Sequence, residues 1–274
     1  MRRERATEHI ELSVRGELAV AARHPSQSPC PRCRDAGFMS EQGPSGVLTS
    51  RPCRCRGVDH RVKAFNQARL PARYLDASLE GFHPRDPSGS EALRRAQELA
   101  WGFTPHSKGL LLYGGYGTGK TYLAVAIARV LTLQRGYSVR FVEMTHLLST
   151  LKASIRGEGG EGPSLLDQLA RVDCLIIDEL GKGQQTEWAQ SVLEELITKR
   201  YNASGTLICT TNYDPRRASR GRAQHLEERV DSRVYSRLQQ MCALTPLFGG
   251  DYRRVAGGEE GERLGEAARA GERG

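Results

Sequence analysis

A run of glycines with one lysine and one threonine is the segment of this 274-residue chain whose residue types point most directly to chemistry. It matches the pattern G-x-x-x-x-G-K-[ST] at every fixed position. Glycines let backbone N–H groups surround phosphate oxygens at the positive end of the helix that follows. We predict that Lys120 binds the β and γ phosphates of ATP and that Thr121 binds Mg²⁺; the alternative is a glycine turn without a ligand. The predicted phosphate-binding residues are Gly114, Gly115, Tyr116, Gly117, Thr118, Gly119, Lys120 and Thr121.

Two carboxylates follow the apolar residues 174–177, at the end of a predicted strand. Parallel sheets bind ligands at the carboxyl ends of their strands. Asp178 is therefore expected in the outer sphere of Mg²⁺, and Glu179 is expected to orient and deprotonate an attacking water. The alternative is a strand that simply ends in solvated acids.

Asn212 follows another apolar stretch, residues 206–210. If this stretch is the strand beside Asp178, the Asn212 amide can bind the same water or the γ phosphate. An asparagine after a strand more often forms a turn, so the residue types alone leave both interpretations open.

The elements that must position these residues alternate between strand and helix patterns, which is typical of an α/β fold with a mostly parallel sheet. A helical pattern also runs over residues 91–101, after a linker broken by prolines. We predict a helix cap at Thr145 and a helix stop at Gly136. The predicted strands are residues 109–113, 139–142, 174–178 and 206–210, and the predicted helices are 121–135, 145–157, 165–171 and 187–200.

In the order and spacing of the glycine loop, the Asp-Glu strand and the Thr-Thr-Asn turn, the chain resembles AAA+ ATPases of the DnaC/DnaI helicase-loader and IstB-like group. The resemblance runs from about residue 70 to residue 253. It includes Leu-Pro-Ala-Arg-Tyr at 70–74 with Ala-Ser-Leu-Glu-Gly-Phe at 77–82, Arg-Val-Tyr-Ser-Arg-Leu at 233–238 and Gly-Asp-Tyr-Arg at 250–253. It implies a five-stranded parallel sheet in the order 5-1-4-3-2 without the helical lid, and Asn212 as the sensor residue.

The resemblance also implies an arginine finger near Arg233 that completes the site of a neighbouring subunit. Independently, Arg229, Arg233 and Arg237 recur every four residues, beside a stripe of large apolar residues with the same spacing. A γ phosphate on a neighbour would balance such a row of cations. We expect Arg233 as the finger and Arg237 as the second choice. The alternative is a solvated face paired with nearby acids.

Four cysteines crowd into the first part of the chain, as C-x-x-C and C-x-C pairs that carry adjacent arginines. This pattern predicts a small zinc module; free thiols or a redox pair are the alternatives. Because C-x-C is a tight spacing, His60 is a possible substitute ligand. The predicted zinc ligands are Cys30, Cys33, Cys53 and Cys55.

Charge and composition suggest the organisation of the whole chain. The net charge is +8, and residues 1–70 hold 13 Lys and Arg against 7 Asp and Glu, which favours an anionic partner without proving one. No apolar run is long enough to cross a membrane, so we expect a soluble cytoplasmic protein. The predicted parts are a basic cysteine-rich partner-binding module over 1–69, a linker over 70–90, the ATPase domain over 91–254 and a disordered tail over 255–274.

The leading expectation is a helicase-loader-like ATPase of DNA replication, with weak turnover that a partner stimulates. Its cofactors would be ATP, Mg²⁺ and Zn²⁺. The zinc module would bind a hexameric replicative helicase, and His146, Lys152 and Arg156 would face single-stranded DNA, although a plain surface helix explains these three equally well. The alternatives are an IstB-like transposition helper that recruits a transposase and an ATP-binding adaptor with little turnover. A nucleotide kinase is disfavoured because no acceptor-binding signature lies beside the phosphate site.

Overall fold

The computed structural model describes residues 10–23, 33–34, 38–42, 48–53, 56–155, 164–183, 186–216 and 225–252. The predicted ligands Cys30 and Cys55, the predicted DNA contact Arg156 and the predicted disordered tail lie outside these ranges.

The core is a five-stranded sheet in which all neighbouring strands run parallel. Its spatial order is β6-β7-β8-β5-β9. Numbered from the first core strand along the chain and read from the β9 edge, this is the predicted order 5-1-4-3-2, which is confirmed. The strands are β5 (Gly109–Tyr113), β6 (Val139–Glu143), β7 (Cys174–Asp178), β8 (Thr206–Thr211) and β9 (Cys242–Pro246).

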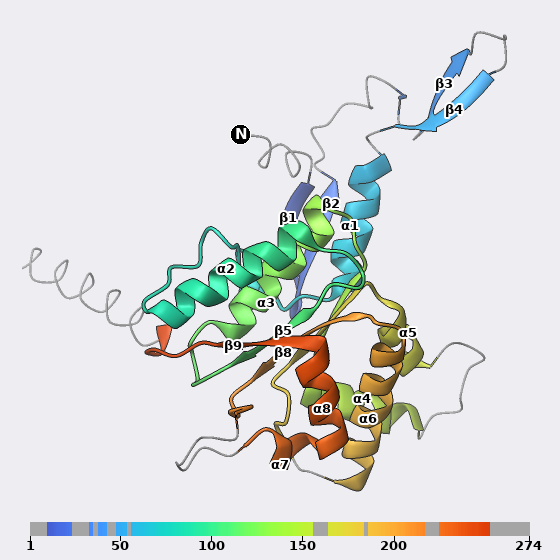
Figure 1. Ribbon diagram of the computed structural model, residues 1–274. Helices are drawn as coiled ribbons and strands as arrows, with labels where there is room; N and C mark the ends of the chain where they lie inside the picture. The colour runs from blue at the N-terminus through green and yellow to red at the C-terminus, as the bar shows by residue number, and fades with distance from the viewer. Residues whose placement is uncertain are drawn as a thin grey trace, which may run out of the picture.

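Helices cover both faces of the sheet, as Figure 1 shows. Because side chains alternate along a strand, Leu110 and Leu112 of β5 pack into one apolar cluster and Leu111 into the other. The first cluster receives α1 (Arg56–Ala68), α2 (Pro87–Gly102), α3 (Lys120–Arg129) and the π-helical turn η3 (Val130–Gln134). The second receives α4 (Met144–Ile155), α5 (Leu165–Arg171), α6 (Glu187–Asn202), α7 (Glu227–Val230) and α8 (Ser232–Met241).

Side-chain caps fix where several helices begin. Ser164 caps α5 and Thr186 caps α6, each by accepting a backbone N–H of the first turn. The Asp86 side chain accepts from Ser88 and Gly89 with Pro87 in the first turn, so α2 begins earlier than the predicted residue 91.

Two predicted details of the helices are wrong. Thr145 does not cap α4, which begins at Met144; its hydroxyl instead donates to the Glu143 carboxylate. The helix predicted over 121–135 changes from α-helix to a π-helical turn after Arg129, where the Arg135 N–H bonds to the Val130 carbonyl at 3.2 Å. Gly136, with a φ of +73°, ends this segment as predicted.

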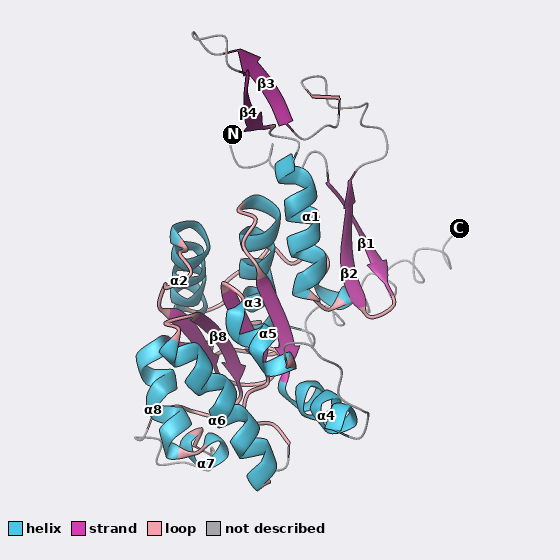
Figure 2. Cartoon of the chain, turned by 90° about the vertical axis from the view of Figure 1, so that its right-hand side faces the viewer, coloured by secondary structure: helices cyan, strands magenta, loops and turns pink. Residues whose placement is uncertain are grey.

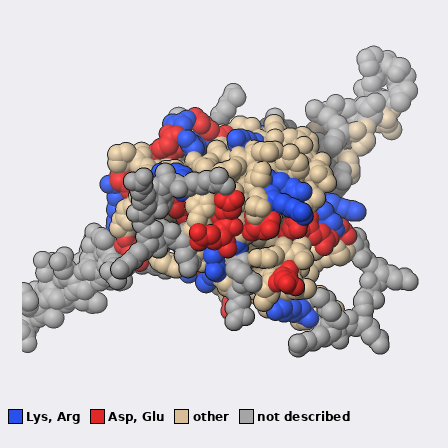
Figure 3. Space-filling model, turned by 60° about the horizontal axis from the view of Figure 1, so that its bottom comes forward, with Lys and Arg blue, Asp and Glu red and all other residues tan. Residues whose placement is uncertain are grey.

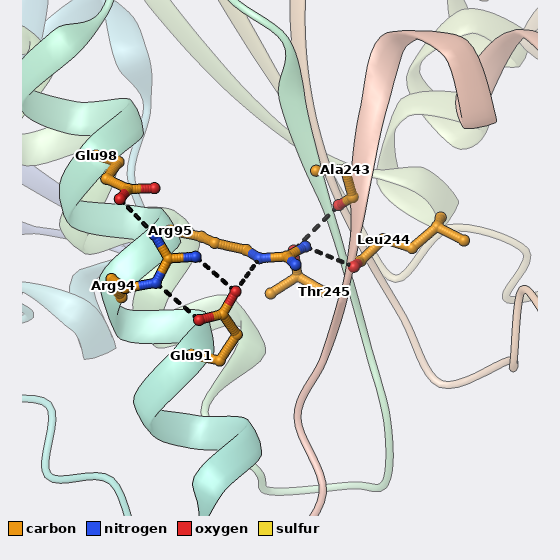
Figure 4. A network of polar contacts seen from close by, with 7 residues as sticks. All are labelled: Glu91, Arg94, Arg95, Glu98, Ala243, Leu244 and Thr245. Atoms are coloured by element: carbon orange, nitrogen blue, oxygen red, sulfur yellow. Dashed lines mark hydrogen bonds and ion pairs between the residues drawn. The ribbon is translucent and has the colours of Figure 1, made fainter.

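An ion-pair network ties α2 to the edge strand β9 (Figure 4). Glu91 accepts hydrogen bonds from Arg94 and Arg95, and these lower the pKa of Glu91 to about 2. Arg95 also donates to the Leu244 carbonyl at 2.9 Å. The outer edge of β9 is therefore occupied by a side chain from the helix beside it, which limits pairing with another strand.

The N-terminal part contains two antiparallel hairpins, β1 (Ile10–Arg15) with β2 (Leu18–Arg23), and β3 (Phe38–Gln42) with β4 (Leu48–Pro52). Figure 2 shows β1 and β2 beside α1, whereas β3 and β4 project from the body. Ala19 of β2 and Phe65 of α1 are buried in the same apolar cluster as residues of α2 and α3. Packing therefore continues across the predicted boundary at residue 70, and the division of the chain into modules stays a prediction.

Surface charge is mixed on the face drawn in Figure 3. Among the described residues, basic side chains lie next to acidic ones and are spread over that face rather than gathered into one patch. Within the described ranges no helix is long and apolar enough to span a bilayer.

Candidate functional site

The glycine loop joins the end of β5 to the start of α3, as the sequence predicts. Gly114 and Gly119 have φ values of +146° and +93°. A Cβ atom on Gly114 would lie 1.9 Å from the Leu247 carbonyl oxygen, and one on Gly119 would lie 2.6 Å from the Phe82 ring. Both the backbone conformation and the close packing therefore require glycine at these positions.

Lys120 lies at the first position of α3 and folds back over the loop. Its Nζ atom donates to the carbonyl oxygens of Gly114, at 3.0 Å, and Gly115, at 2.5 Å, and the residue is only 7% exposed. The ammonium group is thus held at the centre of the loop, where phosphate oxygens would replace the carbonyl partners.

Asp178 ends β7 directly opposite the loop. Its Oδ1 atom accepts hydrogen bonds from Thr121 Oγ1, at 2.8 Å, and from Thr210 Oγ1, at 2.5 Å. Burial raises the pKa of Asp178, while these two hydroxyl donors oppose the shift. A carboxylate and a hydroxyl in contact are oxygen ligands of the kind that Mg²⁺ prefers, so the residues present fit the predicted metal.

Glu179 begins a tight turn after β7 and adopts the left-handed conformation, with a φ of +56°. Its backbone N–H donates to Thr210 Oγ1 at 3.0 Å, so one threonine hydroxyl contacts both acidic residues. The Glu179 carboxylate forms an ion pair with Lys182, three residues along the same turn. In this conformation Lys182 pairs with Oε2 of the carboxylate that we expect to contact water.

These residues surround one cavity of about 650 Å³. The structure brings Lys120, Thr121, Asp178, Glu179 and Asn212 into its wall, although they come from three separate parts of the chain. Asn212 lies just beyond the end of β8, where the sequence places it. The cavity therefore joins a lysine suited to phosphate oxygens with two carboxylates suited to a divalent cation.

A second part of the cavity wall packs against the glycine loop and is not predicted from the sequence as part of the site. Phe82 contacts Tyr122 and Tyr252, with ring centroids 6.1 and 5.9 Å apart, and the Arg85 guanidinium lies 4.1 Å from the Tyr252 ring centroid. The Tyr252 N–H donates to Gly117 O at 3.1 Å. The sequence signals for this wall are the motifs at 70–74, 77–82 and 250–253, which carry the family resemblance without a site role. The wall consists of Pro71, Arg73, Tyr74, Gly81, Phe82, His83, Arg85 and Tyr252.

The two predicted finger arginines lie on α8, away from the cavity. Arg233 is 74% exposed at its side chain, 3.5 Å from the Glu194 carboxylate on α6. Arg237 is 27% exposed and donates to Thr198 at 2.8 Å. Neither is among the described residues that line the cavity of their own chain. The buried stripe beside them is present, but Asp231, with a φ of +69°, divides the expected helix into α7 and α8.

The predicted zinc site falls mostly outside the described residues. Cys53 follows β4 and is buried, and Cys33 is partly exposed. Within the described ranges, no three or more His, Cys, Asp or Glu side chains gather as a metal site. His60 Nε2 lies 2.8 Å from the Gly136 carbonyl oxygen, so in this structure His60 contacts the turn that follows η3. The four-cysteine site stays a prediction.

Comparison with curated proteins finds helicase loaders. The chain is 25% identical to "Replicative helicase loader DnaC" of Escherichia coli strain K12 over 199 residues, which cover 72% of this chain and 78% of the relative. It is 30% identical to the protein of the same name from Buchnera aphidicola subsp. Baizongia pistaciae over 206 residues, covering 72% and 80%.

Solved structures give the same result. A crystal structure of the DnaC helicase loader superposes with a TM-score of 0.58 at 31% identity, covering 64% of this chain and 98% of that one. A structure of DnaI superposes with a TM-score of 0.53 at 24% identity, covering 66% and 93%, and supports the fold.

A family profile covers most of the chain, including every element of the core sheet. The profile described as "IstB-like ATP binding protein" matches residues 50–253. The matched segment contains the glycine loop, Asp178, Glu179 and Asn212, which line one cavity. The chain belongs to the family of IstB-like ATP-binding proteins.

Proposed function

We propose that this protein hydrolyses ATP and acts as a loader of a hexameric replicative helicase. The observation that carries the proposal is the single cavity that joins Lys120 and Thr121 of the glycine loop to Asp178 and Glu179 at the end of β7. The similarity to proteins named as replicative helicase loaders supports the choice of partner.

Each site residue has a separate role in this proposal. Lys120 binds the β and γ phosphates, and Thr121 and Asp178 hold Mg²⁺, which neutralises charge on the phosphates. Glu179 orients the attacking water and accepts its proton after leaving the ion pair with Lys182. Asn212 holds the same water or the γ phosphate.

A neighbouring subunit completes the site in this proposal. Arg233, with 74% of its side chain exposed, would leave its pairing with Glu194 to reach a neighbour's γ phosphate, and Arg237, which is 27% exposed and bonded to Thr198, is the second candidate. Self-association would then occur on a partner ring or on DNA. An arginine supplied in this way accelerates phosphoryl transfer by a factor on the order of 10³ or more.

The partner contacts belong to other surfaces. The four-cysteine zinc module would bind the helicase. The exposed residues His146 and Lys152 of α4 would contact single-stranded DNA together with Arg156. Lys152 Nζ lies over the Trp188 ring, 4.9 Å from its centroid, so a cation and an aromatic side chain lie together at this helix.

A second candidate is a helper that recruits a transposase, because the matching family profile is named for IstB-like proteins. Two co-elution experiments separate the loader from the helper. The purified chain is mixed with a replicative helicase hexamer in one and with a transposase encoded beside an IstB-like gene in the other. ATP-dependent binding to the helicase alone supports the loader. Binding to the transposase alone supports the helper, and ATP binding without turnover in any mixture supports a passive adaptor.

A further inference from the structure

Arg229 is the member of the arginine row that does not share the environment of the other two. Arg233 and Arg237 lie on α8 against α6, whereas Arg229 lies on α7 and points to the turn that follows Glu179. Its Nε–H donates to the Gly181 carbonyl at 3.0 Å, and its Nη2–H donates to the Gly183 carbonyl at 2.7 Å.

The turn that receives these hydrogen bonds has an unusual backbone. Glu179, Gly181 and Gly183 have φ values of +56°, +83° and +94°. A non-glycine residue in the left-handed region is held there by its surroundings. The conformation at Glu179 therefore depends on the groups that fix the turn on either side.

Strand β8 fixes the beginning of this turn. The Leu180 N–H donates to the Thr210 carbonyl at 2.8 Å, and Thr211 Oγ1 donates to the Leu180 carbonyl at 2.8 Å. Arg229 then holds the carbonyl groups of the next residues, so the turn is fixed from the sheet on one side and from α7 on the other.

Packing keeps the Arg229 side chain in place. Its guanidinium carbon lies 5.1 Å from the Tyr213 ring centroid. A Cβ atom on Gly181 would lie 3.1 Å from both Arg229 Cβ and the Tyr213 ring, so the turn, the arginine and the tyrosine are in close contact. A planar guanidinium is well suited to this place, because it stacks on a ring and donates two hydrogen bonds in fixed directions.

We propose that Arg229 is a positioning residue, which acts in its own subunit to hold the turn of residues 179–183 so that the Glu179 carboxylate reaches the attacking water. The inference rests on the proposed role of Glu179 in ATP hydrolysis. It gives Arg229 a different task from Arg233 and Arg237, although the three share one sequence pattern.

The chain contains a matched control for this arginine. Arg135 also donates to two backbone carbonyls, those of Ala100 and Trp101, at 3.1 and 2.6 Å, and lies 5.2 Å from the Tyr137 ring centroid. It does not line the nucleotide cavity. Arg229→Gln and Arg135→Gln therefore remove the same kinds of contact at two places, and only one of them adjoins Glu179.

The experiment measures single-turnover ATP hydrolysis and the affinity for a fluorescent ATP analogue with full-length protein. We expect Arg229→Gln to lower the hydrolysis rate at saturating ATP by about 10-fold or more, with the analogue Kd within about 2-fold of wild type. Arg135→Gln should change both by less than about 2-fold. The hydrolysis rate of Arg229→Lys should fall between those of wild type and Arg229→Gln, because a lysine keeps the charge but cannot donate in both fixed directions.

Several outcomes would overturn the proposal. An equal hydrolysis rate for the two glutamine variants would do so, as would a loss of analogue binding in Arg229→Gln with an unchanged rate. Recovery of turnover when Glu179→Gln subunits are added to Arg229→Gln would show that Arg229 acts on a neighbour. If Glu179→Gln itself hydrolyses ATP normally, the proposed function fails. If Glu179→Gln is inactive while Arg229→Gln is normal, only this inference fails.

Discussion

Replacing Thr210 by valine removes one hydroxyl that serves both acidic residues of the site. Thr210 is 1% exposed, and its Oγ1 atom donates to Asp178 at 2.5 Å and accepts from the Glu179 N–H at 3.0 Å. Valine has nearly the same shape, so the change removes the hydrogen bonds without leaving a cavity. We expect Thr210→Val to reduce both stability and ATP hydrolysis.

The size of the effect follows from the two lost contacts. A hydrogen bond to a charged group contributes about 1.5–3 kcal/mol, and a buried N–H left without a partner costs about 1–3 kcal/mol. Relaxation of the turn offsets part of the sum, so we expect a loss of about 2–4 kcal/mol in the free energy of unfolding. Loss of a donor should also raise the pKa of Asp178 further, because burial already raises it.

The assay compares Thr210→Val with a second buried threonine on the same strand. Thr206 is also 1% exposed, and its hydroxyl lies 2.8 Å from the Ser107 carbonyl oxygen, at the opposite end of β8. Both variants should unfold at lower urea concentration, but only Thr210→Val should lose about 10- to 100-fold in hydrolysis at saturating ATP. Equal hydrolysis rates for the two variants would show that the Thr210 hydroxyl does not support hydrolysis through Asp178 and Glu179.

Three further predictions concern other groups. Asp178→Asn should abolish Mg²⁺-dependent hydrolysis. It should nevertheless raise the free energy of unfolding at neutral pH, by about 1.4 kcal/mol for each unit by which burial raises the Asp178 pKa. Because the folded pKa is the higher one, this gain over wild type should vanish as pH falls through it, and a constant gain in urea unfolding at several pH values would contradict the prediction. Arg200 is 1% exposed and donates to the carbonyls of Ala170, Val172, Asp173 and Thr206, so Arg200→Met should lower the free energy of unfolding by about 3 kcal/mol or more; a loss below about 1 kcal/mol in urea would contradict it. Atomic emission on the purified protein should find about one zinc per chain, falling in Cys30→Ser and Cys55→Ser, with ATP-analogue binding unchanged; equal zinc in all three proteins would exclude these ligands.

The core could be predicted from the sequence because its signals are local. The glycine pattern between a strand and a helix fixes the place of Lys120, and an apolar run of strand length fixes Asp178 at its end. The order of the strands came from the resemblance, since periodicity alone gives no neighbour relations.

The remaining features depend on contacts between distant residues or on single backbone angles. Helix α1 is not predicted, because it follows cysteines and turn residues that indicate a separate module. In the structure, its residue Phe65 is buried in the same apolar cluster as α2 and α3. The division between α7 and α8 rests on the φ of one residue, Asp231. Arg229 shares its spacing with Arg233 and Arg237, and only the fold shows that it contacts the Glu179 turn.

The proposed role of Glu179 in ATP hydrolysis is tested by the variant Glu179→Gln. Its hydrolysis rate is measured beside that of wild type, with and without a replicative helicase hexamer. We predict that the variant binds a fluorescent ATP analogue with wild-type affinity and loses about 100-fold or more in hydrolysis, because Lys120, Thr121 and Asp178 still hold the nucleotide while the base for the attacking water is gone. Analogue binding together with hydrolysis at the wild-type rate would contradict this prediction.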